Sequence, residues 1–336
     1  MKRTALLFAF LTVLSMLTMA QVKRVSVHDP VMIKHSDTYY LFCTGRGISV
    51  LSSKDLQTWK RERPVFEEIP AWTSEAVKGF RGHMWAPDIA YYNGAYYLFY
   101  SVSAFGKNTS CIGVATNKTL NPDDPDFGWV DKGLVIQSFP DVTNWNAIDP
   151  NLIVDNKGTP WLSFGSFWDG LQLIKLKKDL SGPADGTTPV TFCSRKPDPN
   201  TPNPPSIENN PVDAGGNAVE APFIFKKGGY YYLFASIDYC CKGVNSSYKM
   251  IVGRSKNVEG PYVDKEGRSL RAGGGSLLMA GDDDWHGVGH NAVVNMDKKD
   301  YLVFHAYDAN DNGASKLRIF TLKWKKGWPV PDKSVY

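Results

Sequence analysis

A short aromatic strand recurs five times along the chain, and this repeat constrains the fold more than any other feature. The sequence Y-Y-L-F begins at Tyr39, Tyr96 and Tyr231, and the related sequences W-L-S-F and Y-L-V-F begin at Trp161 and Tyr301. The phenylalanines that close the copies are 57, 65, 70 and 70 residues apart and are Phe42, Phe99, Phe164, Phe234 and Phe304. A regular unit of this length indicates a repeat architecture.

Each copy follows a short apolar strand and a turn rich in Asn, Asp, Gly or Lys, which is typical of a β-hairpin. Further strand-like pieces follow the hairpins, such as 48–52, 111–116 and 250–255. Hardly any segment has the period of an amphipathic helix. Four strands per unit and five units predict an all-β fold, a five-bladed β-propeller. The alternatives are a pair of β-sandwiches, which the fivefold recurrence disfavours, and a parallel β-helix, which the irregular spacing disfavours.

Composition limits the function classes. Apolar residues make up 43% of the 336 residues and charged residues 21%, which supports a large core. The net charge of +4, without a stripe of Lys and Arg, argues against a nucleic-acid partner. Aromatic residues reach 13%, which suits both a β-rich core and stacking on sugars.

Residues 1–20 have the pattern of a secretory signal peptide. Lys2 and Arg3 precede an apolar run, and Thr18-Met19-Ala20 ends in a small residue. The run is too short for a comfortable membrane span, and no later segment is apolar enough for one. We therefore expect an exported protein, periplasmic or secreted, whose propeller domain covers residues 21–336 and acts as a monomer.

The five cysteines do not fit a metal finger. Cys43 and Cys111 belong to strand-like segments and are expected to be buried thiols. Cys240 and Cys241 are neighbours, and a disulfide between them is the less favoured reading because adjacent residues are hard to bridge. They are not expected to act as nucleophiles, since no basic residue is fixed near them in the sequence.

One pair of residues stands at the head of each unit. A proline lies twelve residues before the closing phenylalanine, or fourteen in the third copy, and the fifth copy has Ala292 instead. The preceding pairs are His28-Asp29, Trp85-Ala86, Ile148-Asp149, Glu220-Ala221 and His290-Asn291. Because first strands line the axis of a propeller, these pairs are expected to meet at one mouth of the channel.

Three carboxylates, Asp29, Asp149 and Glu220, would meet there. Any one of them could simply cap a turn, but three at corresponding places favour a functional cluster. Glycoside hydrolysis needs an acid and an opposing base or nucleophile. Glu220 lies between apolar residues, so burial and a neighbouring anion are expected to raise its pKa and keep it a proton donor. Asp149 would be that anion, and Asp29 would stay ionised and activate water.

At these residues the chain resembles glycoside hydrolase family 43, most closely its endo-α-1,5-L-arabinanases. The resemblance covers nearly all of the chain after the signal peptide. The motifs that carry it are, in order, H-D-P at His28, G-H-M-W-A-P-D-I at Gly82, N-A-I-D-P-N-L at Asn146, F-G-S-F-W-D-G-L at Phe164, V-E-A-P-F at Val219, S-I-D-Y-C-C-K-G at Ser236 and G-V-G-H-N-A at Gly287.

The resemblance implies a five-bladed propeller that hydrolyses arabinan with inversion. It implies that Asp29 is the general base, Glu220 the general acid, and Asp149 the residue that orients the acid and raises its pKa. No cofactor is implied for the chemistry. His290 corresponds to a histidine that holds a structural Ca²⁺ at the axis, although one imidazole is a poor match to the oxygen ligands of calcium.

Several residues are expected to contact substrate. Trp85 resembles a sugar-stacking tryptophan, with a core position as the alternative, and Phe105 occupies a matching later position. The other expected contacts are His28, Asn146, Ser166 and Trp168, of which the last two lie in a loop that could instead pack the end of a blade.

Other activities remain open at this stage. A Pro- and Asn-rich stretch between Pro197 and Pro211 could shape an endo-acting groove or an exo-acting pocket. The alternatives to an arabinanase are an α-L-arabinofuranosidase or β-xylosidase on the same fold, and a non-catalytic sugar-binding propeller.

Overall fold

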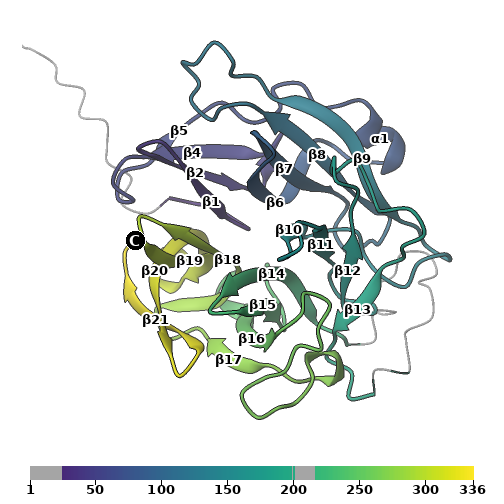
Figure 1. Ribbon diagram of the computed structural model, residues 1–336. Coiled ribbons are helices and arrows are strands. Elements are labelled where there is room, and N and C mark those ends of the chain that lie inside the picture. The colour runs from purple at the N-terminus through teal and green to yellow at the C-terminus, as the bar shows by residue number, and fades with distance from the viewer. Residues whose placement is uncertain (1–24, 199, 201–215) are drawn as a thin grey trace, which may run out of the picture.

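The fold is known from a computed structural model that describes residues 25–198, 200 and 216–336. The signal-peptide segment and most of the Pro- and Asn-rich stretch lie outside these residues. Five antiparallel sheets surround a central axis, each with its first strand innermost, which confirms the predicted five-bladed propeller (Figure 1). None of the helices in the described ranges has the length and apolar character needed to cross a membrane.

Each sheet follows chain order from the axis outward. The short strand β3 (Gly45–Arg46) lies between β2 and β4 in the chain but pairs with β6, so it belongs to the sheet of blade 2. The strands of blade 1 are β1 (Val31–His35), β2 (Thr38–Cys43), β4 (Ser49–Ser53) and β5 (Lys60–Arg61). Those of blade 2 are β3 (Gly45–Arg46), β6 (His83–Tyr92), β7 (Ala95–Val102), β8 (Ser110–Asn117) and β9 (Val130–Ser138).

The remaining blades have four strands each. Blade 3 contains β10 (Asn151–Val154), β11 (Pro160–Phe164), β12 (Leu171–Lys175) and β13 (Val190–Cys193). Blade 4 contains β14 (Val219–Lys227), β15 (Tyr230–Ile237), β16 (Lys249–Ser255) and β17 (Ser276–Met279). Blade 5 contains β18 (Trp285–Met296), β19 (Lys299–Asp308), β20 (Ala314–Lys325) and β21 (Trp328–Ser334).

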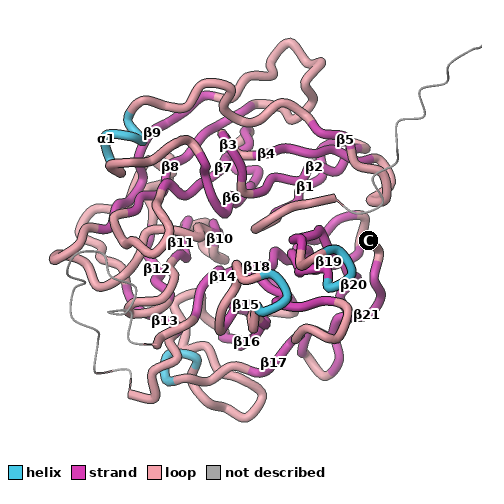
Figure 2. Tube along the Cα trace, turned by 180° about the vertical axis from the view of Figure 1, so that it is seen from behind, coloured by secondary structure: helices cyan, strands magenta, loops and turns pink. Residues whose placement is uncertain are grey.

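Helices are few and short, as the sequence predicts. The α-helix α1 (Trp72–Ala76) precedes blade 2, and the 3₁₀ turns of the described residues lie in loops: η2 (Gly243–Asn245), η3 (Leu270–Ala272) and η4 (Ala309–Asp311). Seen from behind, loops dominate the periphery and the strands radiate from the axis (Figure 2).

The five closing phenylalanines form the hydrophobic layers between blades. Phe42, Phe99, Phe164, Phe234 and Phe304 are each at most 1% exposed. Phe234 and Phe304, from adjacent blades, share one buried cluster with Tyr232. Replacing such a side chain by alanine costs about 3–5 kcal/mol, so the repeat is a packing requirement.

The two ends of the described chain close the ring. The backbone N–H of Leu317, in β20, donates to the carbonyl of Val25, and the N–H of Val335 donates to Ile319. The Val25 N–H also donates to the hydroxyl of Tyr336. The last blade is therefore completed by residues from both termini.

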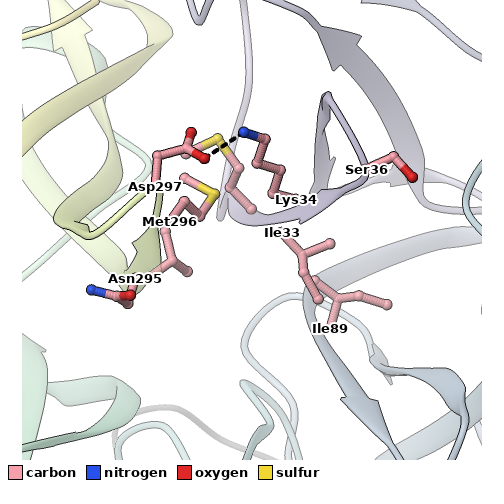
Figure 3. A pocket seen from close by; sticks show the side chains of 9 residues that line it. Ile33, Lys34, Ser36, Ile89, Asn295, Met296 and Asp297 are labelled. Atoms are coloured by element: carbon pink, nitrogen blue, oxygen red, sulfur yellow. Dashed lines mark hydrogen bonds and ion pairs between the residues drawn. The ribbon is translucent and has the colours of Figure 1, made fainter.

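A cavity of about 380 Å³ opens at the hairpin ends of the innermost strands of blades 1 and 5 (Figure 3). Lys34 and Asp297 form an ion pair beside it, and Met32, Ile89 and Met296 supply apolar walls. The strand starts, where the candidate residues stand, lie at the other mouth of the channel.

Candidate active site

At the start of the innermost strand of every blade, one residue has a left-handed backbone conformation. The φ angles lie between 45° and 58° and belong to Asp29, Ala86, Asp149, Ala221 and His290. A non-glycine residue in this conformation costs about 1–3 kcal/mol, so five equivalent cases mark a feature of the repeat. In blade 5 the kink comes at His290, one residue earlier than the repeat spacing predicts.

Side chains of neighbouring blades hold these kinks in place. In three blades the N–H of the kinked residue donates to a hydroxyl two residues after a closing phenylalanine of the preceding blade. The pairs are Ala86 with Thr44 Oγ1 at 2.9 Å, Asp149 with Ser101 Oγ at 3.0 Å and His290 with Ser236 Oγ at 2.8 Å. Thr44, Ser101 and Ser236 were not predicted from the sequence, although a Ser or Thr stands two residues after four of the closing phenylalanines.

Blade 4 departs from this pattern at the candidate acid. The corresponding hydroxyl, Ser166 Oγ, donates to Glu220 Oε2 at 2.7 Å. The N–H of Ala221 instead donates to Asp149 Oδ2 at 3.1 Å. One carboxylate thus replaces the hydroxyl as acceptor, and the freed hydroxyl orients Glu220.

Asp29 lies among three histidines and a threonine. Its Oδ1 is 2.8 Å from His28 Nδ1 and 3.0 Å from His290 Nδ1, and its Oδ2 accepts from the hydroxyl of Thr44. Its N–H donates to His305 Nδ1 at 3.2 Å. Burial alone would raise the pKa of Asp29, but His28 and His290 outweigh burial and hold this pKa well below its ordinary value. Asp29 is therefore an ionised carboxylate at neutral pH.

His290 links the three acidic residues electrostatically. Burial opposes its charge, but Asp29, through its charge and hydrogen bond and with help from the other two acids, outweighs burial and raises the pKa of His290 to about 9. Burial, with smaller contributions from Glu220 and Asp29, raises the pKa of Asp149 to about 8 against the opposing effect of His290. At neutral pH a cationic imidazole thus lies beside an ionised Asp29 and a protonated Asp149.

Glu220 is less enclosed than the sequence predicts. Its side chain is half-buried, whereas Asp29 and Asp149 are 7% and 6% exposed. Burial raises the pKa of Asp149, one blade away. Tyr248, 1% exposed, lies against Glu220, and burial together with the charges of Glu220 and Asp149 raises the pKa of its phenol. The burial expected for Glu220 is therefore only partial, because the mouth leaves this side chain partly open to solvent.

The expected substrate contacts divide into exposed and buried groups. His28 and Trp85 are half-buried, and the indole Nε1 of Trp85 donates to His83 Nδ1 at 3.0 Å. Phe105 is 82% exposed in the loop that follows β7, on the side where Ser101 pairs with Trp85. These three side chains are open to a ligand.

Asn146 and Trp168 are each 3% exposed. The backbone carbonyl of Trp168 accepts from Asn217 Nδ2 at 2.9 Å, so this residue helps to pack the end of blade 3. A direct contact of the Trp168 ring with sugar does not fit this burial, and the alternative of a packed blade end does. Ser166, at 4% exposed, reaches the site through Glu220.

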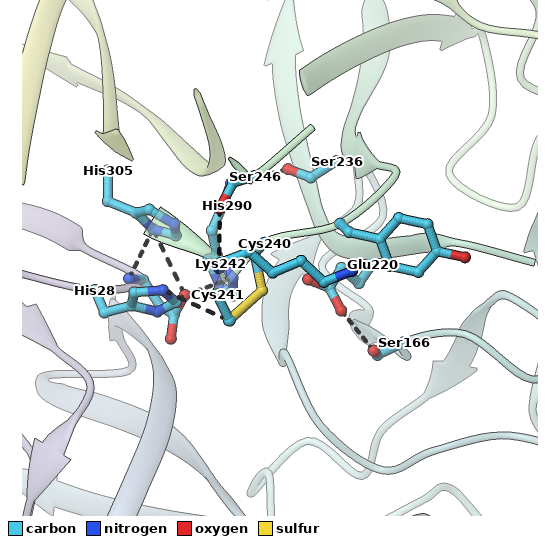
Figure 4. Close-up of a disulfide and its surroundings, with 12 residues drawn as sticks. His28, Ser166, Glu220, Ser236, Cys240, Cys241, Lys242, Ser246, His290 and His305 are labelled. Atoms are coloured by element: carbon cyan, nitrogen blue, oxygen red, sulfur yellow. Dashed lines mark hydrogen bonds and ion pairs between the residues drawn. A yellow bond between two sulfur atoms is a disulfide. The ribbon is translucent and has the colours of Figure 1, made fainter. Parts of the chain in front are cut away.

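The cysteines differ from expectation at one place. Cys43, Cys111 and Cys193 are buried free thiols, as expected for the first two. Cys240 and Cys241 are joined in a disulfide, and Cys241 Sγ lies 3.8 Å from His28 Nε2 (Figure 4). The sequence disfavoured this bond and placed no base nearby, because His28 is remote in sequence and reaches Cys241 only through closure of the ring.

His290 is the candidate metal ligand at this mouth of the channel. Its Nδ1 faces Asp29, and its Nε2 makes no hydrogen bond to the described part of the chain. The adjacent Asn291 is 3% exposed, and neither atom of its amide has a hydrogen-bond partner among the described residues. Buried amides without a protein partner commonly bind water or an ion. Protein ligands alone do not make a calcium site here, since Ca²⁺ takes six to eight oxygens.

Comparison with known proteins identifies the family. The model for glycosyl hydrolases family 43 matches residues 21–329. An extracellular exo-α-(1→5)-L-arabinofuranosidase of Cellvibrio japonicus is 51% identical over 93% of this chain and 88% of its own. An extracellular endo-α-(1→5)-L-arabinanase of Bacillus subtilis is 45% identical over 90% of this chain and 87% of its own.

A solved structure gives the same result. The α-L-arabinanase of Cellvibrio cellulosa, complexed with arabinohexaose, superposes with a TM-score of 0.87 at 50% identity, over 92% of this chain and 96% of its own. The resemblance inferred from the ordered motifs is thereby confirmed, and the chain belongs to glycosyl hydrolases family 43.

Proposed function

We propose that this chain is an inverting glycoside hydrolase that cleaves α-1,5-L-arabinofuranosidic bonds in arabinan. One observation carries the proposal: three carboxylates from three blades, Asp29, Asp149 and Glu220, surround one cationic His290 at the same mouth. The names of the relatives support arabinan as the substrate, since those proteins are described as arabinanases and an arabinofuranosidase.

In the proposed reaction Asp29 is the general base. A water molecule attacks the anomeric carbon and gives its proton to the Asp29 carboxylate, which His28, His290 and Thr44 keep ionised and oriented. Glu220 gives its proton to the leaving glycosidic oxygen as the bond to the anomeric carbon breaks. Two carboxyls that flank a sugar with room for water produce inversion at that carbon.

Asp149 acts as a positioning residue for the acid. Its Oδ2 accepts the N–H of Ala221, which follows Glu220 in the chain. The hydroxyl of Ser166 donates to the Glu220 carboxyl itself. Together they fix the rotamer from which Glu220 can reach the leaving oxygen.

Exposed residues at the mouth would bind the sugar chain. We assign stacking on the sugar to Trp85, further contact to Phe105, and a polar contact to His28. The buried residues beneath this surface, Asn146, Ser166 and Trp168, would support the substrate-binding residues by packing against them.

No cofactor is needed for this chemistry. For the structural Ca²⁺, His290 would release the proton on Nε2 and supply that nitrogen as one ligand, with water as the rest and Asn291 placed to bind one of those waters. We also propose that the protein is exported, supported by the leader-like residues 1–20 and by relatives that are named extracellular, and that it acts as a monomer.

Product analysis from debranched arabinan over time tests the activity. Rapid formation of mixed oligosaccharides supports endo action, and release of one short product from chain ends supports exo action. Preference for aryl arabinofuranosides or aryl xylosides over arabinan would favour the other enzymes of this fold.

Glu220→Ala provides the control for catalysis. This variant should lose turnover and still bind arabino-oligosaccharides, as measured by calorimetry. If wild type and variant bind sugar equally and neither hydrolyses any of these substrates, the protein is a sugar-binding propeller and the proposal fails.

A further inference from the structure

The Cys240–Cys241 disulfide has no part in the reaction proposed above, yet it lies at the active-site mouth. It belongs to the loop between β15 and η2, and Figure 4 shows it with His28, His290 and Glu220 around it. Cys240 is half-buried and Cys241 is exposed. This bond is therefore open to solvent, unlike the three free thiols, which are all buried.

A continuous chain of contacts runs from this loop to the candidate base. The N–H of Cys241 donates to Tyr307 Oη at 2.7 Å, and Tyr307 Oη is 2.8 Å from His28 Nε2. His28 Nδ1 is in turn 2.8 Å from Asp29 Oδ1. A neutral His28 can therefore accept the proton of the Tyr307 hydroxyl at Nε2 and donate from Nδ1 to Asp29.

The Tyr307 hydroxyl also meets the side chain of Ser246. The residue is 4% exposed in β19, and its ring packs edge-on against His305 with centroids 5.4 Å apart. Glycine at position 287 leaves room for the ring, because a Cβ there would lie 2.7 Å from Tyr307 Cδ2. Packing sets the plane of the ring, and the Cys241 amide, His28 and the Ser246 side chain together set the direction of its hydroxyl.

The disulfide constrains the Cys241 amide, which is the first member of this series of hydrogen bonds. Cys241 has φ of 65°, a left-handed conformation that a non-glycine residue adopts only at a cost. The bond closes both cysteine side chains and the peptide between them into one small ring, which restricts the backbone at both residues. When the bond opens, Cys241 can relax toward a common backbone conformation, and its N–H then turns away from Tyr307.

The rest of the loop is held independently. The N–H groups of Ser247 and Tyr248 donate to the carbonyl of Tyr239, and the N–H of Lys242 donates to Ser246 Oγ at 3.0 Å. Asp238, just before the loop, forms ion pairs with Arg195 and Lys249 on either side. Opening the disulfide should therefore change the site locally without unfolding blade 4.

We propose that the Cys240–Cys241 disulfide is a positioning element for Asp29, acting through the Cys241 amide, Tyr307 and His28, so that its reduction slows catalysis. The inference rests on the proposed function, in which Asp29 is the base. A water-soluble phosphine can carry out the reduction: the sulfur–sulfur bond takes up two electrons and two protons to give two thiols, and the phosphine gains an oxygen atom from water.

Kinetics with and without the phosphine test the proposal on the intact protein. Reduction should raise the thiol count, titrated after unfolding, from three to five. It should lower kcat on arabino-oligosaccharides about tenfold, since small misplacements of a reacting group cost one to two orders of magnitude. KM and the thermal unfolding midpoint should change little. A count of five thiols with unchanged kcat would overturn the proposal.

Two variants separate this route from a general loss of structure. The Cys240→Ser/Cys241→Ser protein should have the low kcat of the reduced enzyme and should not respond further to phosphine. Tyr307→Phe removes the hydroxyl alone and should lower kcat to a similar extent. Combining the two changes should add little, because both break the same chain of contacts.

Fully additive losses in the combined variant would show that the disulfide does not act through Tyr307. If the serine variant fails to fold, the comparison of reduced and oxidised wild type still decides the matter. Hydrolysis of arabinan by the oxidised wild type is measured first, so a failure of the proposed function is recognised separately.

Discussion

Replacing Asp149 by asparagine should make the protein more stable while making it less active. Burial raises the pKa of Asp149 from an ordinary 3.8 to about 8. Between these values the folded state keeps a proton that the unfolded state has released, so this group makes stability fall as the pH rises. The slope for one proton is about 1.4 kcal/mol per pH unit. Asparagine has nearly the same shape, can still accept the Ala221 N–H, and does not titrate.

The difference in unfolding free energy between the variant and wild type isolates this effect, because other carboxyl groups titrate in both proteins. The variant's advantage should grow by roughly 2 kcal/mol between about pH 4.5 and about pH 6. His290 does not interfere there, since its raised pKa means that it loses its contribution only at higher pH. Denaturant unfolding at both pH values measures the difference. Parallel stability curves for the two proteins would refute the account of Asp149 as a buried, protonated acid.

Three other changes test separate parts of the site. Ser166→Ala removes a hydrogen bond to a carboxylate, worth about 1.5–3 kcal/mol, and should lower kcat on arabino-oligosaccharides about 10- to 100-fold with little change in KM; an unchanged kcat would contradict the role of Ser166 in orienting Glu220. Trp85→Ala should raise KM about tenfold through lost stacking, and a pure kcat effect would argue against a sugar platform there. Removing calcium with a chelator should lower the thermal unfolding midpoint of wild type but not of His290→Ala; equal shifts in both proteins would place any calcium elsewhere.

The propeller could be predicted because its signal lies in local sequence. Each closing phenylalanine packs between blades, so the same residue types recur at regular intervals in the sequence. The pairs at the strand starts follow from that repeat by simple counting. Asp29, Asp149 and Glu220 were found in this way, and their meeting at one mouth follows from ring closure.

The partners of these residues were harder to predict because they come from other blades. His305 and Tyr307 contact the base region only after the fold brings the first and last blades together, whereas Thr44 reaches Asp29 within blade 1. The same closure brings His28 to Cys241. The relative burial of the carboxyl groups could not be predicted either, since the sequence around Glu220 does not show that Asp149 is more buried than Glu220.

Product stereochemistry tests the central claim most directly. Proton NMR, recorded within the first turnovers of an α-linked arabino-oligosaccharide, reports the anomer released before mutarotation mixes the two forms. An acid at Glu220 and a water-activating base at Asp29 predict that the β-anomer forms first. Initial release of the α-anomer would require a covalent intermediate on a carboxylate and would contradict the assignment of Asp29 as base.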